Sequence, residues 1–402
     1  MYWIKVIGIN MLLIFFTIVI VELSLGKWSD NDYPNLEYQI LKKTYVDRGS
    51  IGVKPDIITL YPKKNGFRFD NNIDLEKITD CMVITMGGST TQEFILSQEE
   101  TWSQQLQDEL NINSQEIYDR CSGKYFVMNL GMSGHSIATN LWLLRNYIHD
   151  SKLNPLAIVV YQGINDWHSI LNSDSKYIPL RHIKHEIVKD IKYRSFIKSL
   201  VRRINESISG DIKNRTADNN FNGDGFLFKV ENHENPKKFE GEFVYEKLNN
   251  NLIKTSGQWG GVNYHMSYIK KFVDFTDKFF PDTKLIFITQ TMPICDLRNF
   301  PNEFGYKNTS NEKSNIPYNK FNNKEWLSNK GTCLRLGLIK SNYLSFNQEN
   351  SKVKVIDYAG SFLEGLDESY DQYHKNPYGS RLFFNRVKKQ LLCAIAFCSS
   401  SE

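Results

Sequence analysis

Residues 82–91 read MVITMGGSTT, and this stretch indicates the fold. Residues 82–86 form a continuous apolar run interrupted only by Thr85, which is typical of a strand buried on both faces of a sheet. The glycine pair that follows lets the backbone turn sharply, and a helical segment comes next. A strand, a tight turn and a helix in this order predict a parallel α/β sheet, with Ser89 at the edge where such sheets bind ligands.

Four further apolar runs support this interpretation, at residues 126–130, 157–161, 285–289 and 353–356. Between the runs lie apolar residues at helical spacing, such as Trp102, Leu106 and Leu110. Buried strands alternating with helices predict a doubly wound α/β fold with five strands. A last helix is expected from about residue 377 to 392, because Pro377 suits a first helical turn.

Size and charge narrow the class of protein. The chain has 402 residues, with 49 Lys and Arg against 45 Asp and Glu. That length accommodates one large domain or two ordinary ones. A net charge of +4 is too balanced to argue for a nucleic-acid partner, and the sequence carries no motif typical of one. We therefore expect no nucleic acid among its partners.

Six cysteines stand at positions 81, 121, 295, 333, 393 and 398, and no two form a C-x-x-C pair. This spacing argues against a structural zinc site. An even number of cysteines permits disulfides in an exported protein. Cys295 and Cys333 are the first pair to expect, since both fall in one loop-rich stretch; unpaired buried thiols are the alternative.

The N-terminus is strongly apolar. No charged residue occurs from position 6 to position 21, and the run continues to Leu25 with only Glu22 interrupting. A helix from about Trp3 to Leu25 is long enough to span a bilayer, which needs about 20 residues. We expect an uncleaved signal anchor. A cleaved signal peptide is the alternative, because Ser24 and Gly26 are small residues at plausible cleavage positions. Either reading places the rest of the chain outside the cytoplasm, in a periplasmic or extracellular space.

The chain divides into four predicted parts. Residues 1–27 are the anchor or signal segment, 28–78 an extension, 79–392 the α/β domain and 393–402 a tail. The stretch from about 167 to 258 shows no buried strand and is read as an insertion over the sheet. Within it, residues 183–204 are basic and partly amphipathic, so they could lie on an anionic membrane or form the solvated face of a helix. His182 and His185 are read as surface residues, because no carboxylate or Cys motif near them suggests a metal site.

Candidate chemical groups follow the strands. Gly134 comes after the second strand and has a backbone N–H that could approach an oxyanion closely. Asn165 comes after the third strand and can turn its amide into the same cleft; Asp166 is read as a helix cap. Beyond the last strand, Asp371 precedes His374 by three residues, so its carboxylate could fix the imidazole tautomer and stabilise the imidazolium.

Two other readings of these turns are weaker. The Gly-Gly-Ser turn could hold phosphate, but no Gly-Lys-Ser/Thr follows it. Ser133 could be a nucleophile elbow, but the required Gly-x-Ser-x-Gly fails because position 135 is His. Ser89 is therefore the candidate nucleophile, with His374 as its base.

The order of these motifs resembles that of the SGNH (GDSL-type) hydrolase superfamily. The matching blocks are Gly-Gly-Ser-Thr-Thr, Asn-x-Gly-x-x-Gly, Gly-x-Asn-Asp and Asp-x-x-His-x-x-Pro-x-Gly, with Thr289-Gln290-Thr291-Met292-Pro293 after the fourth strand. The resemblance covers roughly residues 79–167 and 260–392. The first block has Gly-Gly-Ser in place of Gly-Asp-Ser, a variant that also occurs among anchored members. Asn65-Gly66-Phe67-Arg68, ahead of the first strand, resembles those anchored members as well.

The resemblance implies a flavodoxin-like doubly wound five-stranded parallel sheet and a set of roles. Ser89 would be the nucleophile, His374 the general base and Asp371 its orienting acid. The Ser89 N–H, the Gly134 N–H and the Asn165 side chain would form the oxyanion hole. The reaction would pass through an acyl-enzyme and would need no metal and no organic cofactor.

Three functions remain open. An esterase would use water to remove acyl groups such as acetyl from a small molecule, a glycan or a lipid. An O-acyltransferase would pass the acyl group to a cell-surface polysaccharide. A non-catalytic glycan-binding module on the same fold would be expected to have lost a catalytic position, and none is lost. Esterases are the more common of the two enzymes in the superfamily that the sequence resembles, so the expectation is an exported, membrane-anchored serine esterase.

Overall fold

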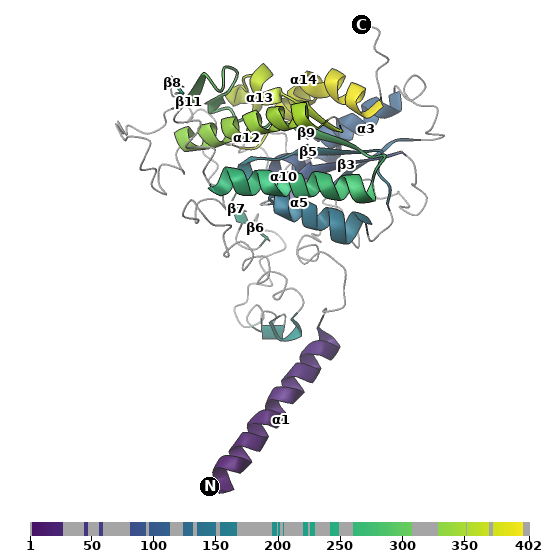
Figure 1. Cartoon of the computed structure of the whole chain (residues 1–402), viewed down its shortest axis with the longest axis vertical. Coiled ribbons are helices and arrows are strands. Elements are labelled where there is room, and N and C mark those ends of the chain that lie inside the picture. The colour runs from purple at the N-terminus through teal and green to yellow at the C-terminus, as the bar shows by residue number, and fades with distance from the viewer. Residues whose placement is uncertain are drawn as a thin grey trace.

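The centre of the molecule is a five-stranded parallel sheet, seen in a computed structural model of the chain (Figure 1). The structure describes residues 2–26, 44–46, 56–58, 81–93, 96–112, 124–131, 135–149, 153–166, 195–198, 200–201, 204, 220–223, 226–229, 242–248, 260–307, 329–350, 352–369 and 373–396. The strands of the sheet are β3 (Met82–Gly87), β4 (Phe126–Asn129), β5 (Ala157–Tyr161), β9 (Lys284–Ile288) and β12 (Val353–Ile356). Each falls within a residue of its predicted position.

The strand order is β12-β9-β5-β3-β4, and every neighbouring pair is parallel. This is the flavodoxin-like order, so the predicted fold class is confirmed. The chain leaves β3 first towards β4 and later returns to the other side of β3 to form β5. The strand order therefore reverses at β3. Open α/β sheets bind ligands at such a point, beyond the carboxyl ends of the strands.

Helices cover both faces of this sheet (Figure 1). They alternate with the strands along the chain: α3 (Trp102–Ile112), α5 (Ile137–Leu143) continued by a π-turn η5 (Leu144–His149), α10 (Gly260–Phe279), α12 (Asn329–Glu349) and α14 (Pro377–Ala396). Short elements complete the α/β body: α2 (Ser89–Gln92), α13 (Tyr358–Ser361), η4 (Gln98–Glu100), η6 (Ile164–Asp166) and η10 (Leu366–Glu368). The last helix begins at the predicted Pro377 and runs four residues further than expected.

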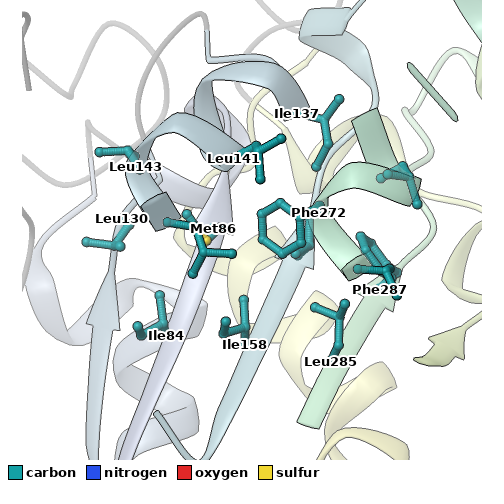
Figure 2. Close-up of a cluster of buried hydrophobic side chains, with 14 of the residues drawn as sticks. Ile84, Met86, Leu130, Ile137, Leu141, Leu143, Ile158, Phe272, Leu285 and Phe287 are labelled. Atoms are coloured by element: carbon teal, nitrogen blue, oxygen red, sulfur yellow. The ribbon is translucent and has the colours of Figure 1, made fainter. Parts of the chain in front are cut away.

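Alternate residues of the strands feed two separate cores. Ile84 and Ile158 point to the face covered by α5, α10 and α12, where they pack with Leu141 and Phe272 (Figure 2). On the opposite face, under α3 and α14, the buried residues include Val83, Val159, Trp102, Leu106, Leu110 and Phe383. Both faces of the strands are buried, which explains why their sequences are continuously apolar rather than alternating.

A second sheet was not predicted. Strands β10 (Cys295–Asp296), β11 (Glu303–Lys307) and β8 (Phe243–Lys247) form an antiparallel sheet in the order β10-β11-β8. Strand β8 comes from the predicted insertion and pairs with β11. The expected disulfide between Cys295 and Cys333 is present and joins this sheet to α12. Cys81 and Cys393 also form disulfides.

Helix α1 (Tyr2–Leu25) stands apart from the α/β body as a separate rod (Figure 1). Its segment Lys5–Leu25 is long and apolar enough to span a membrane or to act as a signal sequence, and none of it is buried. Two short antiparallel pairs complete the described elements: β1 (Thr44–Val46) with β2 (Asp56–Ile58), and β6 (Asn220–Gly223) with β7 (Phe226–Lys229). Most of the extension at 28–78 and most of the insertion at 167–258 lie outside the described residues.

Candidate active site

Ser89 begins helix α2 directly after β3, and His374 lies just before α14. The two residues are 285 positions apart in the sequence, yet Ser89 Oγ lies 2.8 Å from His374 Nε2. Ser89 is half-buried and the His374 side chain is 9 % exposed. A neutral imidazole can accept the serine proton through Nε2, so this pair has the geometry of a nucleophile and its general base.

Three hydrogen bonds hold the turn that carries Ser89. Thr91 Oγ1 donates to Tyr161 O at the end of β5 (3.0 Å), which ties α2 to the neighbouring strand. Asn129 Nδ2, at the end of β4, donates to Thr91 O (2.8 Å), and Asn129 Oδ1 accepts from Gly131 N (2.9 Å). These bonds explain the Thr of the first motif and the Asn-x-Gly of the second. Both motifs are visible in the sequence, but the roles of Thr91 and Asn129 follow only from these contacts.

The turn ends in an unusual backbone conformation. Glu93, the residue after α2, has φ 48° and therefore lies in the left-handed region, which is uncommon for a residue with a side chain. Its carboxylate is buried and accepts a hydrogen bond from Trp102 N (2.7 Å), the first residue of α3. This contact holds Glu93 in place and so fixes the end of the short helix that begins with Ser89.

Asn165 lies beside the nucleophile turn, in η6 after β5. A Cβ added at Gly88 would collide with Asn165 Nδ2, so glycine at this position allows the amide to approach the backbone just before Ser89. Asn165 Nδ2 is buried and has no hydrogen-bond partner among the described residues. A buried amide without a partner calls for an explanation, and an oxyanion formed next to Ser89 would supply the missing acceptor.

The neighbouring Asp166 is fully buried and caps a helix, as predicted, although the helix is α5 and not its own turn. Asp166 Oδ1 accepts from Ile137 N (3.0 Å), the first residue of α5, and Asp166 Oδ2 accepts from Gln162 Nε2 (2.8 Å). His265 Nδ1 from α10 lies 3.1 Å from Asp166 Oδ1. This network holds the turn that carries Asn165 from three sides.

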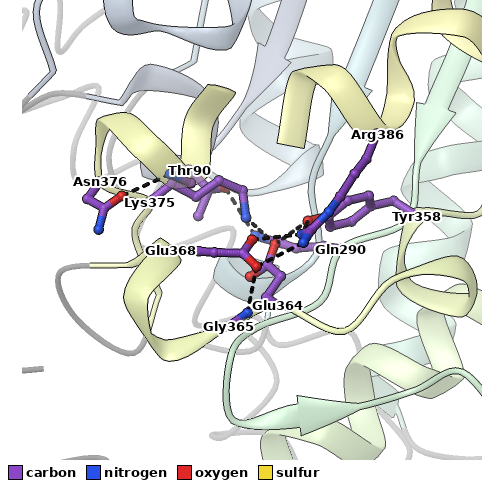
Figure 3. Close-up of polar contacts among 10 residues, drawn as sticks. Thr90, Gln290, Tyr358, Glu364, Gly365, Glu368, Lys375, Asn376 and Arg386 are labelled. Carbon is purple, nitrogen blue, oxygen red and sulfur yellow. Dashed lines mark hydrogen bonds and ion pairs between the residues drawn. The ribbon is translucent and has the colours of Figure 1, made fainter. Parts of the chain in front are cut away.

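A buried ion pair lies next to His374. Lys375 and Glu364 form an ion pair with both side chains almost completely buried (Figure 3). Glu364 also accepts a hydrogen bond from Tyr358 Oη (2.9 Å). Burial, and then the Glu364 carboxylate, raise the pKa of the Tyr358 phenol, so it stays protonated and keeps donating. The ion pair holds the Lys375 side chain inside the protein, while the side chain of the adjacent His374 contacts Ser89.

A second set of contacts fixes the two ends of the segment that carries His374. Arg386 of α14 makes two hydrogen bonds to the Glu368 carboxylate, at 2.7 and 2.9 Å (Figure 3). Asn376 N donates to Glu368 O (3.0 Å), and Asn376 Oδ1 accepts from Gly379 N in the first turn of α14 (2.8 Å). These bonds hold position 376 against position 368, and Ser369 pairs with Lys375 in an isolated antiparallel bridge, so the residue next to His374 is fixed to the start of this segment.

A buried guanidinium adds positive charge near this loop. Arg335 of α12 is 3 % exposed and donates to Gly331 O (3.1 Å) and Thr332 Oγ1 (3.0 Å). Burial lowers its pKa to about 9, while the nearby Tyr373 acts in the opposite direction. Tyr373 is adjacent to His374 in the chain, so Arg335 lies close to the candidate site.

Of the predicted site residues, Ser89, His374 and Asn165 lie together at one edge of the sheet. Asp371 and Gly134 lie outside the described residues, so their predicted roles as orienting acid and oxyanion donor stay predictions. Ser133, His182 and His185 also lie outside the described residues.

No family model matches the chain, and no curated protein matches it by sequence. Several solved structures are similar to it at low sequence identity. An acetyl xylan esterase has a TM-score of 0.38 and 12 % identity, covering 77 % of this chain and 99 % of that one. An acetylxylan esterase from Geobacillus stearothermophilus has a TM-score of 0.38 and 10 % identity, covering 80 % and 98 %. A GDSL-like lipase from Bacteroides thetaiotaomicron has a TM-score of 0.35 and 10 % identity, covering 78 % and 87 %.

Proposed function

We propose that this protein is a serine-dependent ester hydrolase of the SGNH type, with Ser89 as nucleophile and His374 as general base. The observation that carries the proposal is the 2.8 Å contact between Ser89 Oγ and His374 Nε2. Asn165 supports it, because its Nδ2 is buried, has no hydrogen-bond partner among the described residues and lies against Gly88. A nucleophile, a base and an oxyanion donor are the parts that acyl transfer requires.

In the first half of the proposed reaction, His374 Nε2 takes the proton of Ser89 Oγ as the oxygen attacks the ester carbonyl. The carbonyl oxygen becomes negatively charged and accepts hydrogen bonds from Asn165 Nδ2 and the Ser89 N–H. The latter lies in the first turn of α2, where backbone N–H groups have no partner within the helix. Collapse of the intermediate expels the alcohol, which takes the proton from His374, and leaves an acyl group on Ser89.

In the second half, His374 takes a proton from water, and the resulting hydroxide attacks the acyl-enzyme through the same oxyanion site. The acid is released and Ser89 recovers its proton. Asp371 would orient His374 and stabilise the imidazolium, and the Gly134 N–H would be the third oxyanion donor. The proposed steps use only side chains and backbone N–H groups of this protein together with water, so the proposed reaction needs neither a metal nor an organic cofactor.

The proposed place of action is outside the cytoplasm. Helix α1 would remain as an uncleaved anchor, and the catalytic domain, residues 79–392, would lie in the periplasm or at the cell surface. The substrates would be acylated small molecules, glycans or lipids met there. The insertion at 167–258 would influence which substrates bind. Its strand β8 pairs with β11, and β11 belongs to the chain segment that follows Gln290 and Pro293 beyond the sheet edge carrying Ser89.

A substrate screen tests this proposal. The detergent-solubilised full chain is assayed on p-nitrophenyl acetate, butyrate and octanoate, and then on acetylated glycans, with mass spectrometry of the products. The proposal predicts a free acid and a free hydroxyl, released at rates that depend on Ser89. Acyl transfer to an added glycan in preference to water would identify an O-acyltransferase instead. Binding of acetylated glycans without turnover of any ester would contradict the proposal.

A further inference from the structure

Gln290 joins two segments of the candidate site that are far apart in the sequence. It lies two residues beyond β9 and is 3 % exposed. Its Nε2 donates to Thr90 Oγ1 (3.1 Å), 200 residues away, and its Oε1 accepts from Ile164 N (2.8 Å), 126 residues away. Thr90 follows Ser89 and Ile164 precedes Asn165, so a single amide connects the nucleophile turn to the turn that carries the proposed oxyanion donor.

The orientation of this amide follows from its partners. A backbone N–H can only donate, so the oxygen of Gln290 must face Ile164. The NH₂ group is then directed at the hydroxyl of Thr90, which can accept. Gly163 lies against the same side chain: a Cβ added there would be 3.1 Å from Gln290 Oε1, closer than side chains normally pack. Both turns are thus fitted closely around Gln290.

We propose that Gln290 is a positioning residue, which fixes the distance between Ser89 and the Asn165 amide without contacting the substrate. This inference rests on the function proposed above. A misplacement of about 1 Å in such a pair can lower a rate by about 100-fold, because the donor must meet the oxyanion and not the ground-state carbonyl. Loss of the Gln290 bonds would free the two turns to move apart while the sheet beneath them persists.

A purely structural role would give a different result, and the preceding residue provides the control. Thr289 Oγ1 accepts from Ala359 N (2.9 Å) and donates to Asp357 Oδ1 (3.0 Å). These bonds connect the end of β9 to α13 and reach neither Ser89 nor Asn165. Thr289→Val therefore removes buried hydrogen bonds from the same loop but leaves both turns of the site held.

The experiment measures how fast a fluorophosphonate labels Ser89 in full-length Gln290→Met, Thr289→Val and wild type. Rates are normalised to folded protein, and the maximal labelling rate is separated from probe affinity. We expect Gln290→Met to lower the maximal rate by about 10- to 100-fold with little change in affinity. Thr289→Val should lower thermal stability and label at the wild-type rate. Equal maximal rates for Gln290→Met and wild type would overturn the inference.

Variants of Thr90 test the same hydrogen bond from its other partner, and they remain informative if Gln290→Met fails to fold. Thr90→Val removes the acceptor of the Gln290 bond and should slow labelling, whereas Thr90→Ser keeps the hydroxyl and should restore it. Because both residues act through one bond, the double variant should lose less than the product of the single effects. Independent effects would contradict positioning through Gln290. Absence of labelling in wild type would instead contradict the proposed function, and this inference with it.

Discussion

His265 and His374 each lie beside a hydroxyl group, and the two hydroxyl groups differ in their surroundings. His265 is completely buried; its Nδ1 lies 3.1 Å from Asp166 Oδ1 and its Nε2 lies 2.9 Å from Tyr343 Oη. His374 has its Nε2 on Ser89 Oγ, and both residues retain some exposure. Both sites place an imidazole against a hydroxyl, but the Tyr343 side chain is buried whereas Ser89 is half-buried.

The difference shows that a pair of residue types does not define a catalytic site. Tyr343 is buried, and burial, followed by the charge of Asp166, raises its pKa well above the usual value, so its hydroxyl stays protonated. The Tyr343–His265–Asp166 chain is therefore a fixed support beneath the turn of Asn165. The Ser89–His374 pair lies where the strand order of the sheet reverses, and Ser89 is half-buried rather than enclosed.

Substitution of each histidine gives the sharpest comparison. His374→Ala should lower kcat by about 10⁶-fold, close to the effect of Ser89→Ala, because a nucleophile and its base act as a unit. His265→Phe should leave kcat within about tenfold of wild type, equal to less than about 1.4 kcal/mol of activation free energy. Turnover of p-nitrophenyl acetate by active-site-titrated protein measures both. A His265→Phe loss as large as that of His374→Ala would contradict the distinction.

Asn165 and Asp166 are adjacent in the chain but belong to different sites: Asn165 lies beside Ser89, and Asp166 contacts His265. Asn165→Ala should lower kcat by about 10²- to 10³-fold, the usual effect of losing one oxyanion donor. The unfolding free energy of this variant should hardly change, since Asn165 Nδ2 makes no hydrogen bond to the described residues. Asp166→Asn should act mainly on stability, because that carboxylate caps α5. Unchanged kcat in Asn165→Ala would remove Asn165 from the oxyanion hole.

The ion pair next to His374 should affect folding more than chemistry. Lys375→Met leaves Glu364 buried without its cation, which costs about 3–5 kcal/mol when a buried pair is broken. The double variant Lys375→Met with Glu364→Gln should recover much of this free energy, because no buried charge remains. Urea unfolding, followed by tryptophan fluorescence, measures the difference. Equal stability of the single and double variants would show that the pair is not buried as a pair.

The smallest expected effect concerns Tyr343→Phe. This change removes one hydroxyl and leaves His265 Nε2 without that partner, for a loss of about 1–3 kcal/mol in unfolding free energy. Labelling of Ser89 by a fluorophosphonate should keep its wild-type rate. A slower rate with unchanged stability would mean that the His265 chain takes part in the reaction.

The sequence predicted the parallel sheet well because its strands are buried on both faces and so appear as unbroken apolar runs. Strand β8 was missed for the converse reason: it is partly exposed, and its partner β11 lies about sixty residues further on. The approach of Ser89 and His374 could be predicted because both follow parallel strands, whose carboxyl ends share one edge. The contacts of Gln290 could not be predicted, although its Thr-Gln-x-x-Pro motif was noted, since its partners lie 126 and 200 residues away in the sequence. The partners of His265 are also distant, and no motif marks that residue.

The central claim is that Ser89 is a nucleophile activated by His374. Its most direct test treats the full-length protein with a fluorophosphonate and locates the adduct by peptide mass spectrometry. We expect one adduct, on the peptide containing Ser89, which disappears in Ser89→Ala and forms far more slowly in His374→Ala, while His265→Phe labels as wild type. An adduct on another residue, or labelling of Ser89 that does not depend on His374, would contradict it.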